Sequence, residues 1–277
     1  MKVQARATLA LPRFIEIRGD DHWQAVDFVS DLHLSPALPR TFEAFERYLM
    51  STPADVVMIL GDLFDVWVGD DSAAYGFEAD CLDVIAQAAC RAQIGFMAGN
   101  RDFMMGTAAL SGAGMFAMVD PTVVEAFGSR VLLTHGDALC LDDLEYQKFR
   151  RMVRDPEWQA RMLAQPLAVR RELGRQLRGE SQARTADRES DWFDVDAASA
   201  VRWLHEAGCS VMVHGHTHQP GSEPLAPGYL RHVLSDWDLE SPDPSRHRAE
   251  VLRWSASGFT RLRVHPVEDD DAGNAGR

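Results

Sequence analysis

The stretch AVDFVSDLH at residues 25–33 decides the fold, because a short apolar run ends abruptly in carboxylate and imidazole side chains. Four later stretches repeat this design: DVVMILGD (55–62), IGFMAGNRD (94–102), RVLLTHGD (130–137) and CSVMVHGHTH (209–218). Apolar runs of this length, bounded by Gly or Asp, are typical of buried strands. Apolar residues at helical spacing over 41–51 and 79–91 predict helices between them. Alternating strands and helices predict an α/β layer architecture with a largely buried sheet.

A helical insertion is predicted over about residues 144–204, where strand patterns are absent. Its apolar residues fall on one stripe at steps of three or four: Trp158, Met162, Pro166, Val169, Leu173 and Leu177. Pro156 and Pro166 are expected to divide it into short helices. Because a polar-tipped strand follows at 210, we interpret this segment as an insertion in the α/β domain, placed where it could form a lid.

The remaining segments complete the predicted organisation. Residues 1–22 are interpreted as an N-terminal extension, 23–265 as the domain that includes the insertion, and 266–277 as a disordered acidic tail. Period-2 patterns predict strands at 232–237, 249–254 and 259–264, which would extend or face the first sheet.

Composition narrows the function classes. The 277 residues are 46% hydrophobic and 25% charged, as in ordinary globular proteins. The formal net charge of −14 argues against a dedicated nucleic-acid binder. No apolar run approaches the roughly 18 residues that cross a bilayer, and no signal peptide is evident, so a cytoplasmic protein is expected. Residues 148–188 are locally basic, with eleven Lys and Arg against five Asp and Glu.

The polar residues at the five strand ends carry the chemistry. They are Asp31, His33, Asp62, Asn100, His135, His216 and His218. Taken singly, each motif is more often a turn or a loop. Jointly they predict one crevice, since ligands bind at the carboxyl ends of strands in open α/β sheets. Carboxylates, imidazoles and a carboxamide without thiolate suit Mn²⁺, Fe²⁺ or Zn²⁺. Seven ligands are too many for one ion and predict two ions about 3.5 to 4 Å apart.

The same residues carry a family resemblance. The blocks DLHL (31–34), GDLFD (61–65), GNRDF (99–103), HGD (135–137) and GHTH (215–218) resemble those of the calcineurin-like metallophosphoesterases. More narrowly, GDLFDVWVGDD, GNRDFMMG, LLTHGDALCLDD and VHGHTHQP resemble the UDP-2,3-diacylglucosamine diphosphatases of lipid A biosynthesis. The resemblance covers about residues 25–265. It implies a sandwich of β-sheets flanked by helices, with a helical lid that accommodates acyl chains.

The resemblance also implies a ligand set and a reaction. Two divalent metal ions are implied, expected to be Mn²⁺. One would be held by Asp31, His33, Asp62 and His218, and the second by Asp62, Asn100, His135 and His216. The expected reaction is hydrolysis of UDP-2,3-diacylglucosamine to UMP and 2,3-diacylglucosamine 1-phosphate (lipid X), by attack of metal-activated water on the α-phosphorus. The implied catalytic residues are Asp62, Asn100, Arg101 and His135.

Arg101 favours a pyrophosphate substrate. Generic members of the resembled family have His after the Gly-Asn pair, where it can help to protonate an alkoxide leaving group. Arginine is a poor proton donor but binds phosphate bidentately. The change suits a phosphate leaving group, which departs without a proton. The plainer interpretation, a surface arginine, fits less well within a block of ligands.

Substrate contacts are implied by alignment with the resembled family. They are Asn100, Arg101, Asp143, Arg178, Ser181, Thr185, Arg188 and His216. Thr185 replaces the usual Asn and Arg188 the usual Lys, which leaves the fine geometry open. A basic, amphipathic insertion beside the crevice also predicts peripheral association with the cytoplasmic face of the inner membrane. The protein is expected to be a monomer.

Two rival functions remain open from the sequence. A soluble nucleotide-pyrophosphate hydrolase or phosphodiesterase could use the same site, and a lipid-binding protein could retain it in a degenerate form. His214 is predicted to pack away from the crevice. Trp67 and the pair Asp70 and Asp71 are left undecided between the site and the scaffold.

Overall fold

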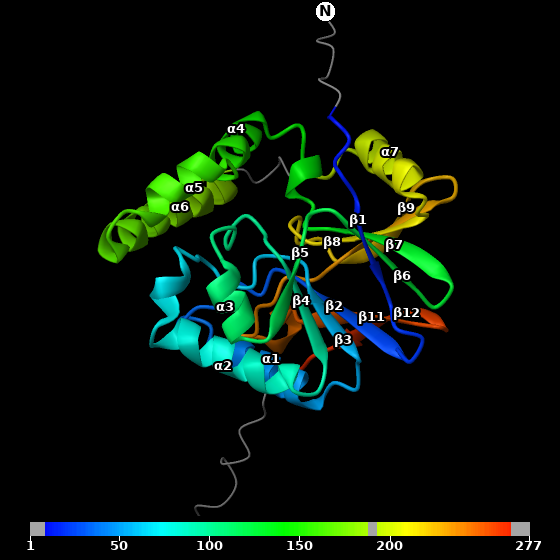
Figure 1. Ribbon diagram of the computed structural model, residues 1–277, viewed down its shortest axis with the longest axis horizontal. Helices are drawn as coiled ribbons and strands as arrows, with labels where there is room; N and C mark the ends of the chain where they lie inside the picture. The colour runs from blue at the N-terminus through cyan, green and yellow to red at the C-terminus, as the bar shows by residue number, and fades with distance from the viewer. Residues whose placement is uncertain (1–8, 188–192, 267–277) are drawn as a thin grey trace, which may run out of the picture.

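Two six-stranded sheets form the centre of the molecule (Figure 1). The computed structural model describes residues 9–187 and 193–266. The first sheet has the order β1 (Ile15–Arg18), β6 (Thr122–Ala126), β7 (Ser129–Thr134), β8 (Val211–His214), β10 (Tyr229–Val233) and β9 (Gly221–Ala226). The second has the order β12 (Gly258–Arg263), β11 (Glu250–Ser255), β2 (Ala25–Val29), β3 (Val56–Ile59), β4 (Gln93–Met97) and β5 (Met115–Met118).

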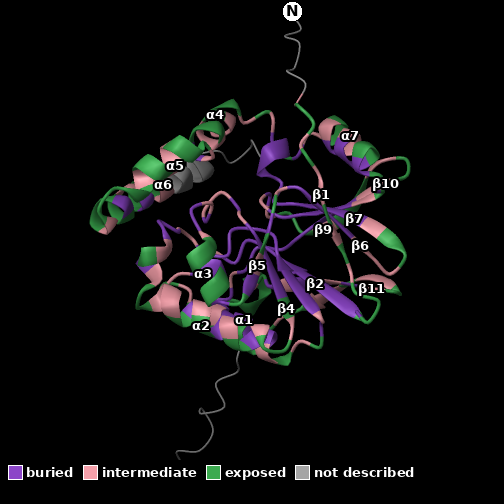
Figure 2. Cartoon of the chain, viewed as in Figure 1, coloured by how far each residue is buried: buried purple, intermediate pink, exposed green. Residues whose placement is uncertain are grey.

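Alternate side chains of a strand point to opposite faces of its sheet and so contribute to two different packed layers. Val26 and Phe28 of β2 pack between the sheets with Val131 and Leu133 of β7. The opposite face of the second sheet packs on α1 (Pro39–Ser51), α2 (Phe77–Ala89) and α3 (Thr107–Gly112). The opposite face of the first sheet packs on α7 (Ala197–Ala207). Both sheets are thereby covered, and the buried side chains gather in them (Figure 2).

The five predicted strands are β2, β3, β4, β7 and β8, and the two predicted helices are α1 and α2. Strands β2 to β5 run parallel, as do β7, β8 and β10. Parallel neighbouring strands end at the same edge of a sheet. In this fold the carboxyl ends of the parallel strands in both sheets face one common region. The structure also contains β5, β6 and β9, which the sequence patterns did not predict.

The insertion contains α4 (Leu144–Val153), α5 (Pro156–Leu163), α6 (Leu167–Asp187) and α7. Pro156 begins α5 and Pro166 precedes α6, as expected from the missing amide proton of proline. Only α4 to α6 stand over the strand ends (Figure 1). The lid expectation for 197–204 is wrong, because Trp203 and Leu204 of α7 are buried against the first sheet.

Two other expectations need correction. Residues 15–18, within the expected extension, form β1 and pair with β6, so this segment joins the first sheet. The strand predicted at 232–237 ends at Val233, after which the chain turns toward the site. The predictions at 249–254 and 259–264 are confirmed as the antiparallel pair β11 and β12.

Candidate metal centre

All seven predicted ligands follow the carboxyl ends of five strands, from both sheets. Asp31 and His33 follow β2, Asp62 follows β3, and Asn100 follows β4. His135 follows β7, and His216 and His218 follow β8. The predicted crevice therefore lies where the two parallel sets of strands end, between the sheets and the lid.

The backbone at this crevice is strained. Five of the six non-glycine residues with positive φ in the described chain are predicted ligands: Asp31 (54°), His33 (49°), Asp62 (54°), His216 (67°) and His218 (52°). Left-handed backbone is unfavourable for residues with a Cβ atom and persists where surrounding contacts enforce it. Concentrated strain of this kind is typical of functional sites.

Glycines let the ligand loops approach one another. A Cβ atom on Gly99 would lie 2.1 Å from Oδ1 of Asp62, and one on Gly215 would lie 2.0 Å from Oγ of Ser30. Any larger residue would push the loops apart. The glycines of the GNRD and GHTH blocks are therefore required by packing.

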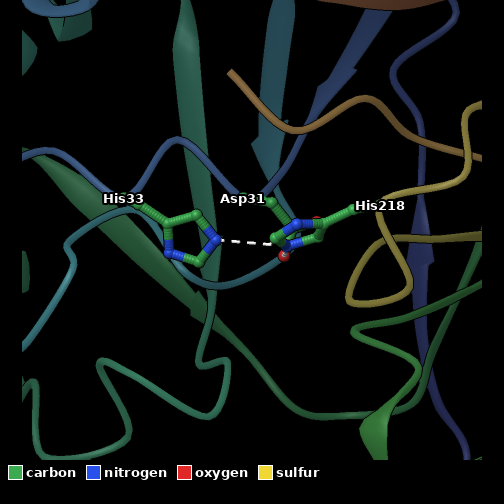
Figure 3. Close-up of side chains that lie close together, drawn as sticks. All are labelled: Asp31, His33 and His218. Atoms are coloured by element: carbon green, nitrogen blue, oxygen red, sulfur yellow. Dashed lines mark hydrogen bonds and ion pairs between the residues drawn. The ribbon is translucent and has the colours of Figure 1, made fainter. Parts of the chain in front are cut away.

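One ligand group consists of Asp31, His33 and His218 (Figure 3). Nε2 of His33 lies 3.2 Å from Nε2 of His218, which lies 3.3 Å from Oδ1 of Asp31. Oδ1 of Asp31 and Nδ1 of His33 are buried without a hydrogen-bond partner among the described residues. Buried lone pairs that converge in this way fit a divalent cation.

The second group consists of Asp31, Asp62 and His135, with ligand atoms within 4.8 Å of one another. Nε2 of His135 lies 3.7 Å from Oδ1 of Asp62 and 3.0 Å from Oδ1 of Asn100. Nδ1 of His216 lies 2.8 Å from the same Asn100 oxygen. The four predicted ligands of the second ion thus lie together. Asp31 belongs to both groups, and Oδ2 of Asp62 lies 4.0 Å from Nδ1 of His33 in the first group.

Supporting contacts hold the ligands in place. Nδ1 of His135 donates to the carbonyl of Leu60 at 2.8 Å, which leaves Nε2 to face the crevice. The buried Asp102 carboxylate accepts from the amides of Leu63 and Gly99 and ties together the loops after β3 and β4.

Burial sets the protonation of the imidazoles. It lowers the pKa of both His33 and His216 to about 3, so both are neutral ligands at pH 7. Burial would also lower the pKa of His135, but the carboxylates of Asp62, Asp137 and Asp31 outweigh it and raise that pKa to about 9. Burial, with Asp102 and Asp31 nearby, raises the pKa of Asp62. The metal-free site therefore retains protons that a cation would displace.

An apolar cavity adjoins the centre beneath the lid. Its lining includes Val66, Trp67, Phe103, Met104, Phe149, Trp158, Met162, Leu173 and Leu177, together with Asn100, Arg101 and Arg178. Four residues of the predicted stripe thus line the cavity. Pro166 and Val169 are exposed, so the prediction that they belong to the same apolar stripe is wrong.

The lid residues expected to contact substrate have several environments. Asp143 caps α4 by accepting from the amide of Tyr146 at 3.0 Å, and Arg178 pairs with Asp65 at 2.5 Å. The side chains of Ser181 and Thr185, and the whole of Arg188, lie outside the described residues. For these three the expected contacts stay predictions.

Comparison with known proteins agrees with this geometry. The family model described as calcineurin-like phosphoesterase matches residues 25–220. The chain belongs to the calcineurin-like phosphoesterase family. The phosphoesterase is 43% identical to a UDP-2,3-diacylglucosamine hydrolase of Bordetella parapertussis over 78% of this chain and 87% of that protein. Proteins of that name from Xanthomonas axonopodis pv. citri and Stenotrophomonas maltophilia are 41% and 40% identical, covering 83% and 84% of this chain and 95% and 96% of theirs.

Both resemblances expected from the motifs are thereby confirmed, as is the assignment to hydrolytic enzymes. The family uses divalent metal ions, and the two ligand groups supply residues for them. Among solved structures, an archaeal phosphodiesterase aligns with 13% identity and a TM-score of 0.44, over 86% of this chain and 98% of that one. No helix in the described part of the phosphoesterase has the length and hydrophobicity needed to cross a membrane.

The structure of the phosphoesterase also shows where His214, Trp67, Asp70 and Asp71 lie. His214 is buried beside Gly136, and burial lowers its pKa to about 4, as expected for a packing residue. Trp67 lines the cavity and donates to Asp70, whose carboxylate also accepts from the amide of Gly106. Asp71 pairs with Arg170 of α6 and so anchors the lid.

Sequence reasoning missed three residues that support the site. Asp102 stands within the quoted GNRDF block. Asp236 lies 3.8 Å from Nδ1 of His218 and stands within the stretch 232–237 that was interpreted as strand. Tyr146 packs against the ring of His216 at 5.6 Å between centroids. The two latter residues lie outside the five ligand blocks, and the apolar patterns do not mark them.

Proposed function

We propose that this phosphoesterase hydrolyses the pyrophosphate bond of UDP-2,3-diacylglucosamine to give UMP and lipid X in lipid A biosynthesis. The observation that carries the proposal is the apolar cavity, which reaches the metal centre at Asn100 and Arg101. A phosphoesterase of small soluble substrates does not need an apolar cavity beside its ligands. Relatives that bear this name match nearly the whole fold, which supports the same substrate.

The donor set suits two divalent ions, and we propose Mn²⁺ as the ion at both positions. One would be held by Asp31, His33, Asp62 and His218, and the other by Asp62, Asn100, His135 and His216. When bound, such ions lower the pKa of water and neutralise charge on phosphoryl oxygens. Asp62 would be shared by the two ions, since its carboxylate oxygens lie 4.0 Å from Nδ1 of His33 and 3.7 Å from Nε2 of His135.

Residues of the chain then orient the substrate. The backbone amide of Arg101 donates to Oδ1 of Asp62 at 2.9 Å. This bond holds Arg101 at the border between the metal centre and the apolar cavity. The guanidinium of Arg101 would bind the phosphoryl oxygens together with the side-chain amide of Asn100. We propose attack at the α-phosphorus with the sugar phosphate leaving. This group needs no proton, so the absence of a histidine after Asn100 is no obstacle.

The lid would select the lipid. Acyl chains would occupy the cavity, while Asp143, Arg178, Ser181, Thr185, Arg188 and His216 would contact the polar part of the substrate. Arg178 lines the cavity and Asp143 lies at the start of α4, which supports their part in the proposal. Contacts from the other lid residues are proposed on the family resemblance alone.

We also propose that the lid rests on the cytoplasmic face of the inner membrane. Four large apolar side chains of α4 to α6 are exposed: Leu144, Met152, Leu163 and Val169. Exposed basic residues such as Lys148, Arg161 and Arg175 share these helices. Apolar and basic groups together favour an anionic lipid surface. A monomer suffices, since one chain supplies all seven ligands.

The test is to incubate the purified protein with UDP-2,3-diacylglucosamine in detergent micelles, with Mn²⁺ or with a chelator, in ¹⁸O water. We expect Mn²⁺-dependent UMP that carries the label, and unlabelled lipid X. Label in lipid X would contradict attack at the α-phosphorus. Cleavage of simple diesters with no cleavage of the lipid substrate would favour the soluble-substrate alternative.

A further inference from the structure

Helix α4 joins the lid to the loops that carry the metal ligands. Nη2 of Arg154 donates to the carbonyls of Ala98 and Gly99 at 3.1 and 2.8 Å, immediately before Asn100. Nε2 of Gln147 donates to the carbonyl of Asp137 at 2.8 Å, two residues after His135. One lid helix therefore contacts the loop after β4 and the loop after β7.

A buried charge cluster is the centre of this junction. The Asp137 carboxylate is fully buried and accepts from Oη of Tyr146 at 2.6 Å and from Nε of Arg150 at 2.8 Å. Nη2 of Arg150 lies 3.7 Å from the buried carboxylate of Asp120, which also accepts from Thr134 of β7. Two buried carboxylates require a cation nearby. Arg150, which is 22% exposed, supplies it from the lid side.

The same helix also forms a wall of the apolar cavity. Tyr146 and Phe149 line it, whereas Arg150 faces the charge cluster and not the cavity. The side chains of one helix thus contact both the space proposed for the acyl chains and the loops that hold His135 and Asn100. A shift of α4 would move the cavity wall relative to the metal centre.

We propose that Arg150 is a positioning residue that, through Asp137 and Asp120, holds the lid in register with the metal-ligand loops. The acyl chains bound by the lid then place the pyrophosphate correctly over the centre. This inference rests on the proposed function, because it assigns the cavity to the acyl chains. It predicts that the cluster matters for the lipid substrate and much less for a small diester that does not contact the lid.

The experiment compares Arg150→Gln with Arg151→Gln, whose side chain is exposed on the same helix. Each Mn²⁺-loaded protein is assayed on UDP-2,3-diacylglucosamine in micelles and on bis(p-nitrophenyl) phosphate. For Arg150→Gln we expect kcat on the lipid substrate to fall roughly 10- to 30-fold, as for loss of a hydrogen bond to a charged group. Diester turnover should stay within about threefold. Arg150→Lys should recover part of the loss, and Arg151→Gln should match the unmodified protein.

Hydrogen–deuterium exchange supplies a readout that does not depend on either substrate. In Arg150→Gln the amides of α4 and α5 should exchange faster, while those of β2, β3 and β4 should be unchanged. Equal losses on both substrates would overturn the proposal, because the cluster would then serve only the metal loops. Unchanged lipid turnover or unchanged exchange would overturn it as well.

The experiment distinguishes failure of the proposed function from failure of the role proposed for Arg150. If the unmodified protein cleaves the diester but not the lipid, the proposed function fails, whereas exchange still reports whether Arg150 holds the lid. If Arg150→Gln does not fold, Arg154→Gln removes the neighbouring contact to Ala98 and Gly99. It should then show the same selective loss on the lipid substrate and the same faster exchange in α4.

Discussion

The metal centre and the lid solve different physical problems. The centre consists of short loops after buried strands, with strained backbone and ligands such as Asp31 and His135 fully buried. The lid consists of helices in which most described side chains keep some exposure (Figure 2). Ion pairs such as that of Arg170 with Asp71 attach it. The difference suits the proposed roles, in which rigid strand ends hold the metal ions and a more loosely packed layer selects the lipid.

The largest expected effect comes from removing the carboxylate that lies near both His33 and His135. Asp62→Ala should lower kcat by about 10³-fold or more, because neither ion would keep its bridging ligand. The fold should survive, since the strands pack without this side chain. The measurements are turnover, metal content per chain by mass spectrometry, and circular dichroism. Near-normal turnover with full metal content would contradict the site assignment.

A matched pair of glycine substitutions tests the difference in rigidity directly. Gly99→Ala should lower kcat by about 10²-fold, because its Cβ would lie 2.1 Å from Oδ1 of Asp62 and push this ligand away. A Cβ on Gly179 of α6 meets nothing within 4 Å, so Gly179→Ala should keep its activity. It should also stabilise the helix by roughly 0.5 to 1 kcal/mol. Kinetics and thermal melting check both, and similar losses for the two variants would remove the contrast between the regions.

The same contrast explains which features could be predicted from the sequence. The centre is encoded locally, because parallel strands bring residues at their carboxyl ends together whatever lies between them. Thus DLH, GD, GN, HGD and GHTH identified the five strand ends and the seven predicted ligands that the structure brings together. Asp236 was missed because it reaches His218 from a non-regular segment after β10, and no pattern of apolar residues announces such a contact.

The lid was less predictable for a related reason. Helical periodicity identifies an apolar face but not the surface that it covers. Trp158 and Leu177 indeed line the cavity, whereas Trp203 of α7 belongs to the core beside the first sheet. Similarly, β1 has the sequence IEIR and lacks the continuous apolar run that marked β3, a strand of the same length. These outcomes depend on tertiary packing, which local propensity does not contain.

The pH dependence of metal binding should distinguish the centre from the lid again. The pKa of His135 is raised to about 9 in the metal-free site, chiefly because Asp62 opposes the effect of burial. Below this pKa the imidazole carries a proton that Mn²⁺ must displace, so affinity should rise as pH increases. We expect roughly tenfold tighter binding per pH unit between pH 7 and 8. Calorimetry in two buffers of different ionisation enthalpy should detect the released proton. Affinity that does not change over this range would contradict the prediction.

The smallest effect is expected where the cavity wall is trimmed. Leu177 of α6 is partly buried and lines the cavity, so Leu177→Ala should remove apolar contact with an acyl chain and leave the ligand loops in place. Loss of about three methylene-sized groups from a half-buried position is worth about 1 kcal/mol in binding, which corresponds to roughly a fivefold rise in KM. The kcat on saturating lipid substrate should change little, because the metal centre does not contact this residue. A fall in kcat with unchanged KM would show instead that the packing of α6 affects the geometry of the metal centre. The distinction between a rigid centre and a selective lid would then not hold for this helix.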